Sequence, residues 1–296
     1  MQGTWLTHRL RDVTAMVIVA LFMFPLFWWG LTSIKPTSAI FDKDEVVFFN
    51  FTPTATNYKV TLLGHSRSEA ATAAGDTFGV GGASSYDSRD TILYSTLVAV
   101  GSTLLTILLG VPAAYALSRM RFRGQQGFLN WVLSQRFMPP IAIIVPLVFM
   151  FHYLRLLDTV FGLVLIDTLM NIPICVLLMK SFFDDVASEV DEAAMIDGAT
   201  RFQIFRRIIL PLVKGGVAAT AVLCFIFSWT EFVLSLFLTT SIRTLPVKIS
   251  TFVTSTGTEW GFIAALGTSA MLPSFIFILL VQRQLVRGLT LGSLKE

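Results

Sequence analysis

The side chains with the clearest capacity for polar chemistry gather in one charged stretch, DEAAMIDGATRFQIFRRIILP at 191–211, between long apolar segments. The spacing of S-x-x-D at Ser188 and of T-x-x-Q at Thr200 is typical of capping boxes, so both positions predict helix starts. Gly198 lies between them and can adopt the left-handed backbone that helix ends commonly need. Residues 186–211 are therefore predicted to form a hairpin of two short, capped helices that is too polar to enter lipid.

The second helix of this hairpin has two different faces. Phe202, Phe205 and Ile209 recur at helical spacing and form an apolar face, whereas Arg206 and Arg207 lie on or near the other side. One interpretation is an amphipathic linker that lies on the membrane, with its arginines against lipid phosphates. The other is a docking surface for a cytoplasmic partner, because two capped helices make a rigid element that can transmit movement. The periodicity is compatible with both.

A second group of polar residues lies inside the apolar segments, where ionisable side chains are costly and commonly functional. The group consists of Arg136, Asp167, Asn171 and Glu231, with Trp229 and Thr230 directly before Glu231. Aromatic rings stack on sugar rings, and carboxylates and amides bond to hydroxyl groups, so such a set suits a sugar or polyol. The candidates for contact with a solute are Trp229, Thr230, Glu231 and Asn171. The alternative is contact between helices, with Asp167 or Glu231 paired with Arg136, or bonds to a second protein.

Nothing in the sequence has the spacing of a catalytic or metal-binding site. His8, His65 and His152 are far apart, and Cys175 and Cys224 lie in apolar segments where buried thiols are common. The sequence contains no GxxxxGK[ST], HExxH, CxxC or GxSxG pattern. We therefore expect no catalytic residue, no metal site and no cofactor bound by this chain.

Six long apolar segments must position these polar groups. Hydrophobic residues make up 54% of the 296 residues and charged residues only 14%, against about 25% in soluble domains. About 20 apolar residues cross a bilayer as a helix, because lipid offers backbone groups no partner. The predicted spans are 13–34, 91–118, 128–151, 160–179, 212–238 and 260–281. The expected fold is an all-α integral membrane protein with six transmembrane helices, and a net charge of +3 gives no reason to expect nucleic acid binding.

The positions of Lys and Arg predict the orientation of these spans. Basic residues concentrate in the tail 1–12, the RMRFRG loop that begins at Arg119, the hairpin 186–211 and the tail 283–296. These parts are expected in the cytoplasm, so both termini lie inside and the membrane domain covers 13–282. The segment 35–90 is then outside, with strand-like or short helical patches followed by a mobile loop rich in Gly, Ala and Ser. The first span is too long for a signal peptide and is expected to remain as an anchor.

The charged stretch resembles a known motif. EAAMIDGATRFQIFRRIILP is similar to the cytoplasmic coupling motif of binding-protein-dependent ABC importer permeases, which reads E-A-A, three residues, G-A/S, and a run ending in I-x-L-P. AAYALSRMRFRG, TSIKPT, FSWTEFVLSLFLT and the tail LVRGLTLGSLKE are similar to segments of the maltose-type carbohydrate permeases. The resemblance covers nearly the whole chain, with 64–90 less typical. It implies the type I ABC importer permease fold and the transport of a sugar or polyol across a bacterial inner membrane.

The resemblance also implies partners and gives roles to residues of the hairpin. Such a permease forms a heterodimer with a second permease and works with a dimer of ATPase subunits, which bind ATP and Mg, and with a periplasmic solute-binding protein. The helix at 188–197 would sit in a groove on an ATPase subunit, and the fifth span would be hinged at Pro211. Gly198 would make a turn that a side chain would obstruct. The coupling residues implied are Glu192, Ala193, Ala194, Asp197, Gly198, Ala199, Arg201, Phe205 and Pro211.

Outside the membrane, the resemblance implies that 251–261 contacts the binding protein. This segment is small, polar and expected to be flexible, although an ordinary connecting loop is the alternative. The candidate contacts are Thr254, Ser255, Thr256, Gly257 and Thr258. Two other functions compete with an importer: a secondary transporter or channel that works alone, and a membrane scaffold. The first should show internal repeats, which the sequence lacks, and the second would not need polar residues inside its spans.

Overall fold

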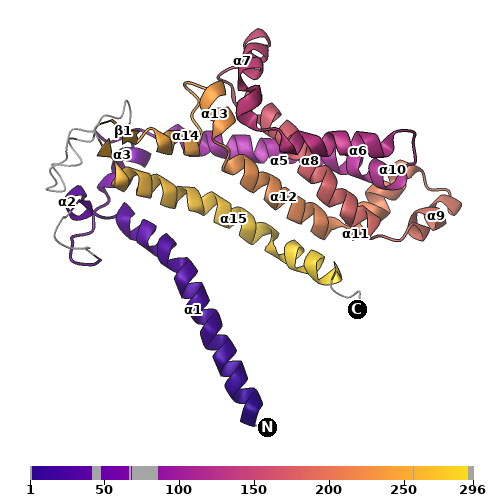
Figure 1. Ribbon diagram of the computed structural model, residues 1–296, viewed down its shortest axis with the longest axis horizontal. Helices are drawn as coiled ribbons and strands as arrows, with labels where there is room; N and C mark the ends of the chain where they lie inside the picture. Colours follow the sequence, from indigo (N-terminus) through magenta and orange to yellow (C-terminus); the bar gives the residue numbers. More distant parts are fainter. Residues whose placement is uncertain (1, 42–47, 67, 69–85, 256, 293–296) are drawn as a thin grey trace. The chain divides into compact units, whose positions relative to one another are not determined.

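The described part of the chain is mostly helical. The computed structural model describes residues 2–41, 48–66, 68, 86–255 and 257–292 (Figure 1). The chain divides into two compact units. The first unit is made of Met1–Arg89 with Lys248–Met271, and the second of Asp90–Val247 with Leu272–Glu296. The charged hairpin and the polar residues of the third, fourth and fifth spans all belong to the second unit.

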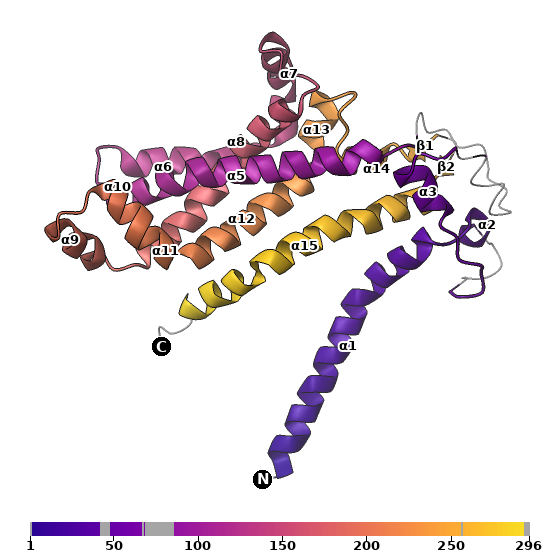
Figure 2. The ribbon, with the colours of Figure 1, turned by 180° about the vertical axis from the view of Figure 1, so that it is seen from behind.

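Three long helices form the centre of the second unit. They are α5 (Arg89–Arg119), α8 (Val160–Asp184) and α12 (Lys214–Trp229), with α6 (Gln125–Ser134) packed on α8 (Figures 1 and 2). Small polar side chains bond between these helices: the hydroxyl of Ser102 donates to Ser228 Oγ at 2.8 Å, and Asn171 donates to the same oxygen at 2.9 Å. Such bonds hold membrane helices together where there is no water to favour apolar contact.

The third span is bent, whereas the sequence predicted one helix over 128–151. It consists of α6, η1 (Gln135–Phe137), η2 (Pro140–Ile143) and α7 (Ile144–Tyr153), and its two halves meet at 97°. Met138 and Pro139 between them are extended, with ψ of 120° and 127°. A residue before proline is driven out of the helical region, and proline has no N–H to donate, so the adjacent Pro139 and Pro140 stop the helix.

The fifth span is interrupted twice, whereas 212–238 was predicted to be continuous. The chain bends by 79° between Arg201–Leu212 and Lys214–Trp229. It then unwinds after Trp229 and resumes as α13 (Val233–Leu238). The Glu231 carboxylate accepts hydrogen bonds from the backbone N–H groups of Leu234 at 2.7 Å and Ser235 at 2.9 Å, and from the Ser235 hydroxyl at 2.8 Å. Glu231 thus caps the start of α13 and stabilises the break.

The remaining spans agree with the prediction in position but not in length. Among the described residues, four helices are long and apolar enough to cross a membrane: His8–Ser33, Arg89–Arg119, Val160–Asp184 and Trp260–Leu280. The count becomes six when each bent pair is one span, as predicted. α1 (Gln2–Ser33) begins inside the predicted tail 1–12, and α15 (Trp260–Gly292) continues into the predicted tail 283–296. Hydropathy marks the apolar part of a helix and not the residue where its backbone hydrogen bonds stop.

Asp158 ties together two connections of the second unit that are predicted to lie outside the membrane. Its carboxylate accepts hydrogen bonds from the backbone N–H groups of Thr240 and Ser241 at 2.9 Å and of Ile242 at 3.0 Å. Burial raises the pKa of Asp158, but the backbone donors outweigh burial and hold this pKa well below its ordinary value. The carboxylate therefore stays charged and keeps the loop before α8 fixed to the loop after α13.

The first unit holds short elements around the outer end of α1. They are α2 (Thr37–Ile40), α3 (Thr56–Leu62), and the strands β1 (Val253–Thr254) and β2 (Gly257–Thr258), which follow α14 (Leu245–Ser250). The amide of Asn57 donates to the carbonyl oxygens of Ser33 at 2.9 Å and Lys35 at 3.1 Å, so it joins α3 to the end of α1. Most of the loop predicted to be mobile, 70–90, lies outside the described residues.

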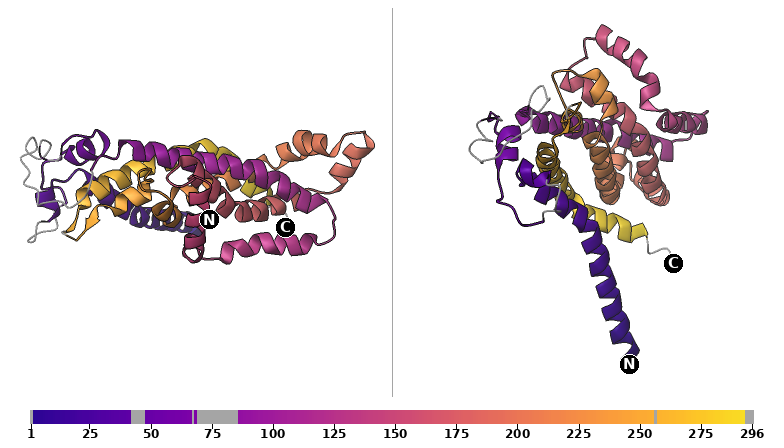
Figure 3. Two further views of the ribbon diagram at one scale, coloured as in Figure 1. Left: turned by 90° about the horizontal axis from the view of Figure 1, so that it is seen from above. Right: turned by 60° about the vertical axis from the view of Figure 1, so that its left-hand side comes forward.

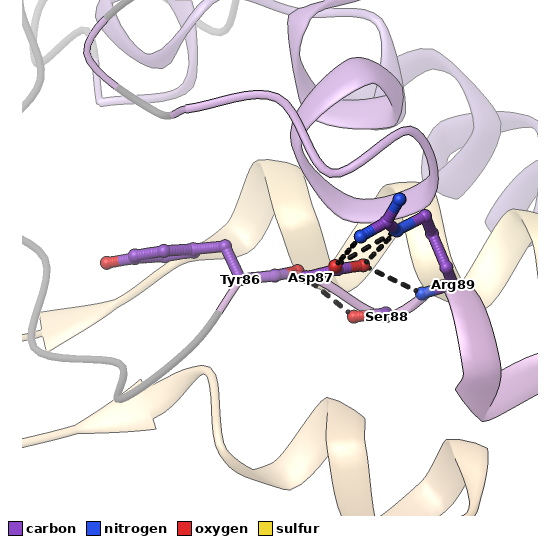
Figure 4. Close-up of polar contacts among 4 residues, drawn as sticks. All are labelled: Tyr86, Asp87, Ser88 and Arg89. Atoms are coloured by element: carbon purple, nitrogen blue, oxygen red, sulfur yellow. Dashed lines mark hydrogen bonds and ion pairs between the residues drawn. The ribbon is translucent and has the colours of Figure 1, made fainter.

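The start of α5 is stabilised by a local cluster. Figure 4 shows the Asp87 carboxylate facing the Arg89 guanidinium, whose Nη2 lies 2.7 Å from Asp87 Oδ2. Asp87 Oδ1 also accepts the Arg89 backbone N–H at 3.1 Å, so the carboxylate satisfies a donor of the first helical turn. Hydrogen bonds from the Arg89 side chain hold the pKa of Asp87 below its ordinary value. Ser88 adds a bond from its hydroxyl to the Tyr86 carbonyl at 3.1 Å.

The packing of α12 against α8 makes a prediction about Gly216. A Cβ atom at Gly216 would collide with the Phe182 ring, whereas one at Gly127 in α6 would meet nothing within 4 Å. We expect Gly216→Ala to lower the free energy of unfolding by about 1–3 kcal/mol, as overpacking of a core commonly does. The measurement is thermal unfolding in detergent, with Gly127→Ala as the matched control. Equal melting temperatures for the two variants would contradict this packing.

Candidate functional site

The charged stretch folds into the predicted hairpin. It contains α9 (Glu189–Ile196), α10 (Arg201–Ile204), the π-helical turn η3 (Phe205–Ile209) and α11 (Leu210–Leu212). It extends beyond the ends of α5 and α12 (Figures 1 and 2, and the left view of Figure 3). The capping box at Thr200 is confirmed: the Gln203 N–H donates to Thr200 Oγ1 at 3.4 Å, and the Thr200 N–H donates to Gln203 Oε1 at 2.8 Å.

Gly198 makes the turn with the left-handed backbone that the sequence predicted. Its φ is +84°, in the left-handed region that side chains disfavour. A Cβ atom there would meet nothing within 4 Å, so no group of this chain would be obstructed. Glycine is required by the backbone conformation and not by crowding inside this chain.

The capping box predicted at Ser188 is wrong. Ser188 has a helical backbone, with φ of −65° and ψ of −24°, and its side chain makes no capping bond. Asp191, which should have completed the box, turns into the protein. There its Oδ2 lies 3.0 Å from Arg119 Nε, and its Oδ1 accepts the Tyr115 hydroxyl at 2.8 Å. The Arg119 contact is an ion pair whose N–H is not aligned for a hydrogen bond.

This ion pair fixes α9 to the end of α5. The side chains of Arg119 and Asp191 are only 11% and 10% exposed, so both charges have left most of their water. Arg119 also donates from Nη2 to the Val186 carbonyl at 2.6 Å, just before α9. Removing one partner of such a buried pair commonly destabilises a protein by about 3–5 kcal/mol, because the other charge is left uncompensated. The hairpin is therefore held to the spans by an interaction that is costly to break.

An apolar cluster continues this connection into the spans. The Tyr115 ring lies 5.5 Å from the Phe183 ring on α8 and 5.0 Å from the Phe205 ring in η3. Ile204 and Ile209 are fully buried in the same cluster, which includes side chains of α5, α8 and α12. A close-packed cluster transmits displacement, because its atoms leave no space to absorb it. Of the predicted coupling residues, Phe205 therefore belongs to the inner face of the hairpin.

The two faces of α9 are clearly divided. Asp191 and Ala194 are buried and face the cluster, whereas Glu192, Ala193 and Asp197 are exposed. Large apolar side chains are also exposed on the hairpin: Met195 at 40%, Ile196 at 87% and Phe202 at 67%. Apolar side chains gathered on an exposed polar element commonly mark a contact with another protein. The prediction had placed Phe202 on the buried face and had not singled out Met195 or Ile196.

The passage into the fifth span bends two residues after the predicted hinge. The N–H of Leu210 donates to the Phe205 carbonyl, which is the wide turn of a π-helix. Pro211 follows, and a proline ring clashes with the carbonyl four residues before it unless the helix is widened or bent. The direction changes at Val213, where φ is −96° and ψ is 15°. Pro211 thus explains the π-turn, and the bend itself lies at Val213.

The four residues predicted to contact a solute all have bonds or packing inside this chain. Trp229 is 7% exposed and stacks on Phe225 at 5.6 Å. Asn171 is buried and bonded to Ser228, and Glu231 caps α13. Thr230 is exposed, with its hydroxyl on the Ile226 carbonyl at 2.8 Å. Their contact with a solute stays a prediction.

The expected pairing of Arg136 with Asp167 or Glu231 is not formed. Among the residues that the structure describes, no carboxylate lies within ion-pair distance of Arg136. Its guanidinium carbon lies 4.5 Å from the Phe227 ring centre, and Nη1 donates to the Met170 carbonyl at 3.4 Å. Asp167 is 2% exposed, and neither of its oxygens accepts a hydrogen bond from a described residue.

The external segment predicted to contact a binding protein is a small hairpin. β1 and β2 are antiparallel, with Val253 opposite Thr258 and Thr254 opposite Gly257. The Thr254 hydroxyl donates to the Gly257 carbonyl at 2.9 Å, and Ser255 is exposed at the turn. Thr256 lies outside the described residues. The segment is thus more ordered than the flexible loop that was expected.

Comparison with known proteins points to one family. The family described as "Binding-protein-dependent transport system inner membrane component" matches residues 106–291. The sulfoquinovosyl glycerol transport system permease protein SmoH of Agrobacterium fabrum is 31% identical over 288 residues, which cover 97% of this chain and 93% of that protein. The trehalose transport system permease protein SugB of Mycobacterium tuberculosis is 32% identical over 283 residues, 94% of each chain. A crystal structure of a bacterial ABC transporter involved in import of the acidic polysaccharide alginate shares the fold, with a TM-score of 0.69 at 19% identity over 96% of this chain and 98% of that chain.

The ion pair predicts how the hairpin responds to mutation. We expect Asp191→Ala to loosen the hairpin, because Arg119 then keeps a buried charge without its partner, and to speed tryptic cleavage after Arg201, Arg206 or Arg207. The double variant Arg119→Ala/Asp191→Ala should be cleaved more slowly than the sum of the two single effects predicts, because contacting residues are coupled.

Cleavage rates measured by mass spectrometry test this expectation. Lys180→Ala is the matched control, since it removes an ion pair with Asp184 whose side chains are 25% and 46% exposed. Such exposed pairs add little stability. Strictly additive effects of the Asp191 and Arg119 substitutions would show that the two residues do not act as a unit.

Proposed function

The chain belongs to the family of inner membrane components of binding-protein-dependent transport systems, and we propose that its cargo is a sugar or polyol taken up by a bacterial cell. It is a permease subunit of an ATP-driven importer, and ATP is hydrolysed on a different subunit. The cargo assignment is supported by relatives similar over nearly their whole length, whose names refer to sulfoquinovosyl glycerol and trehalose. A transporter or channel that works alone would leave the capped, docked hairpin without a purpose.

The observation that carries the coupling role is the division of the hairpin into two faces. The outer face presents Glu192, Ala193 and Asp197 around exposed Met195 and Ile196, and we assign it to the groove of an ATPase subunit that binds ATP and Mg. The inner face is held against the spans by the ion pair between Arg119 and Asp191 and by the aromatic cluster around Tyr115. Because Ala193 is small, the ATPase subunit can approach the backbone of α9 closely. The apolar side chains of Met195 and Ile196 beside it would be buried against that subunit. The remaining coupling residues, Gly198, Ala199, Arg201 and Pro211, shape the turn and the path back to the spans.

Other partners follow from the surface of the spans. The side chains of α1 between Leu10 and Phe27 are mostly apolar, which suits contact with a second permease subunit and with lipid. We propose a heterodimer of permeases in the inner membrane, with both termini and the hairpin in the cytoplasm. The basic residues of the RMRFRG loop and of the hairpin support this orientation.

The proposed function is tested on the complete importer. The chain is purified with its second permease, ATPase subunits and binding protein, and ATP hydrolysis is measured in proteoliposomes with a panel of sugars and polyols. At least one member should raise the rate and be taken up. Absence of any response across the panel, from a complex that hydrolyses ATP, would contradict the carbohydrate assignment.

The docking face predicts the effect of a charge at Ile196. We expect Ile196→Glu to prevent the ATPase subunits from co-purifying, because the buried glutamate would be unpaired in the interface. The chain itself should keep its melting temperature, since this side chain is 87% exposed. Leu154→Glu is the matched control, an exposed leucine at 52% in the loop between α7 and α8. Normal co-purification of the Ile196 variant would place the ATPase contact elsewhere.

A second prediction concerns the external hairpin. We propose that Thr254, Ser255, Thr256, Gly257 and Thr258 contact the binding protein. Replacing Ser255 by Arg should reduce the stimulation of ATP hydrolysis by the loaded binding protein by about tenfold, corresponding to the loss of one good contact. Co-purification with the ATPase subunits should not change. Ser66→Arg, at another exposed external serine, is the control, and equal stimulation of both variants would leave β1–β2 as a connecting element.

A further inference from the structure

The breaks of two spans meet at one level of the second unit. η2 and α7, which follow the break at Met138 and Pro139, pack against α13, which follows the break at Glu231 (Figures 1 and 2). Residues 136–142 are exposed along this broken stretch. Irregular backbone inside a membrane is tolerated only where other protein covers it or where it lines a water-filled cavity, because lipid offers it no hydrogen bonds. This stretch therefore faces a partner protein or an aqueous pathway.

Arg136 stands at this break and near the middle of the membrane. Its two contacts fix its depth, because Met170 and Phe227 lie on different helices. Met170 comes ten residues after Val160, ~15 Å along α8 at the rise of a helix, and Phe227 comes thirteen residues after Lys214, ~20 Å along α12. Since α8 enters from the outer side and α12 from the inner side in the proposed orientation, both estimates place the guanidinium well inside the hydrocarbon region.

The charge of Arg136 is open to a ligand. The Phe227 ring, 4.5 Å away, occupies one face of the guanidinium and leaves its edges accessible, while the contact to the Met170 carbonyl uses one of five N–H donors. Neither of the two carboxylates of these spans, Glu231 and Asp167, forms an ion pair with Arg136 among the described residues. Glu231 accepts from the backbone at the start of α13, and Asp167 is buried. An arginine does not lose its proton, so an exposed guanidinium at this depth favours a negatively charged group as its ligand or partner.

We propose that Arg136 is the anion-binding residue of the translocation pathway and that the cargo is an acidic sugar, one that carries a carboxylate or a sulfonate. The planar fork of a guanidinium matches the paired oxygens of these groups and binds them with two parallel hydrogen bonds. A neutral sugar would need donors and acceptors at this point but no formal charge. This inference rests on the proposed import of carbohydrates and narrows its substrate class. The competing counter-charge, a carboxylate of the second permease, is separated from it by the experiment.

The experiment uses the complete importer in proteoliposomes. It compares pairs of sugars in which one member carries a carboxylate where the other carries a hydroxymethyl group, such as glucuronate with glucose and galacturonate with galactose. Each pair is tested as monosaccharides and as disaccharides. ATP hydrolysis and uptake are measured for the unmodified chain, Arg136→Gln, Arg136→Lys and the control Arg155→Gln, which removes an exposed arginine from the loop after α7. We expect the acidic member of a pair to be transported. Arg136→Gln should then lower its uptake by at least about tenfold, Arg136→Lys should retain part of it, and Arg155→Gln should leave it unchanged.

Four results would overturn the inference. Transport of neutral members alone would do so while leaving the proposed import of carbohydrates intact, and so would unchanged uptake of an acidic sugar by Arg136→Gln. Failure of Arg136→Gln to co-purify with the second permease would assign the counter-charge to that subunit. If no member of any pair raises hydrolysis, the carbohydrate assignment itself fails, and the inference fails with it.

Discussion

The buried ion pair between Asp191 and Arg119 joins a water-facing hairpin to a helix that crosses lipid. Two charges that have left water stay together, because separating them leaves each uncompensated in a medium of low polarity. The same carboxylate is held by the Tyr115 hydroxyl, so the rotation of α9 about its own axis is fixed as well. With Asp191 and Ala194 turned inward, Ile196 must face outward. The orientation of the proposed docking face thus depends on an interaction within this chain.

The fifth span is interrupted on both sides of α12, whereas the hairpin is fixed rigidly to α5 by the ion pair. The cluster around Phe183 and Phe205 is close-packed and moves as a body, whereas the bend at Val213 and the break at Glu231 lie on either side of α12. A force on the hairpin therefore passes through the close-packed cluster to α12. This helix has a bend at one end and a break at the other. The π-turn before Pro211 belongs to the same arrangement, since widened turns occur often at functional positions. Stiff parts separated by defined bends are what a two-state transporter subunit requires.

Local features of this fold could be predicted from the sequence, and features that depend on distant residues could not. The cap at Thr200 needs only residues within one turn, and it forms as its spacing indicates. The equivalent spacing at Ser188 fails because Asp191 finds Arg119, which is remote in sequence and adjacent in space. Apolar runs located the spans, but the two bent spans depend on how prolines and caps act in three dimensions. Pro139 is visible in the sequence as an interruption, while the 97° bend that follows from it is not.

The charged residues inside the spans also show that contacts between distant residues cannot be predicted from the sequence. In the sequence, Glu231 is a candidate for contact with a solute, and the alternative pairs Asp167 or Glu231 with Arg136. In the fold, the Glu231 carboxylate instead accepts hydrogen bonds from the amide groups at the start of α13, and Asp167 is buried. Arg136 is left with an aromatic face and a carbonyl as its neighbours. Because neither acid forms an ion pair with Arg136 among the described residues, the proposed pathway presents a cation where the sequence had offered the Glu231 carboxylate as a ligand for a sugar, and the proposed acidic cargo follows from that cation.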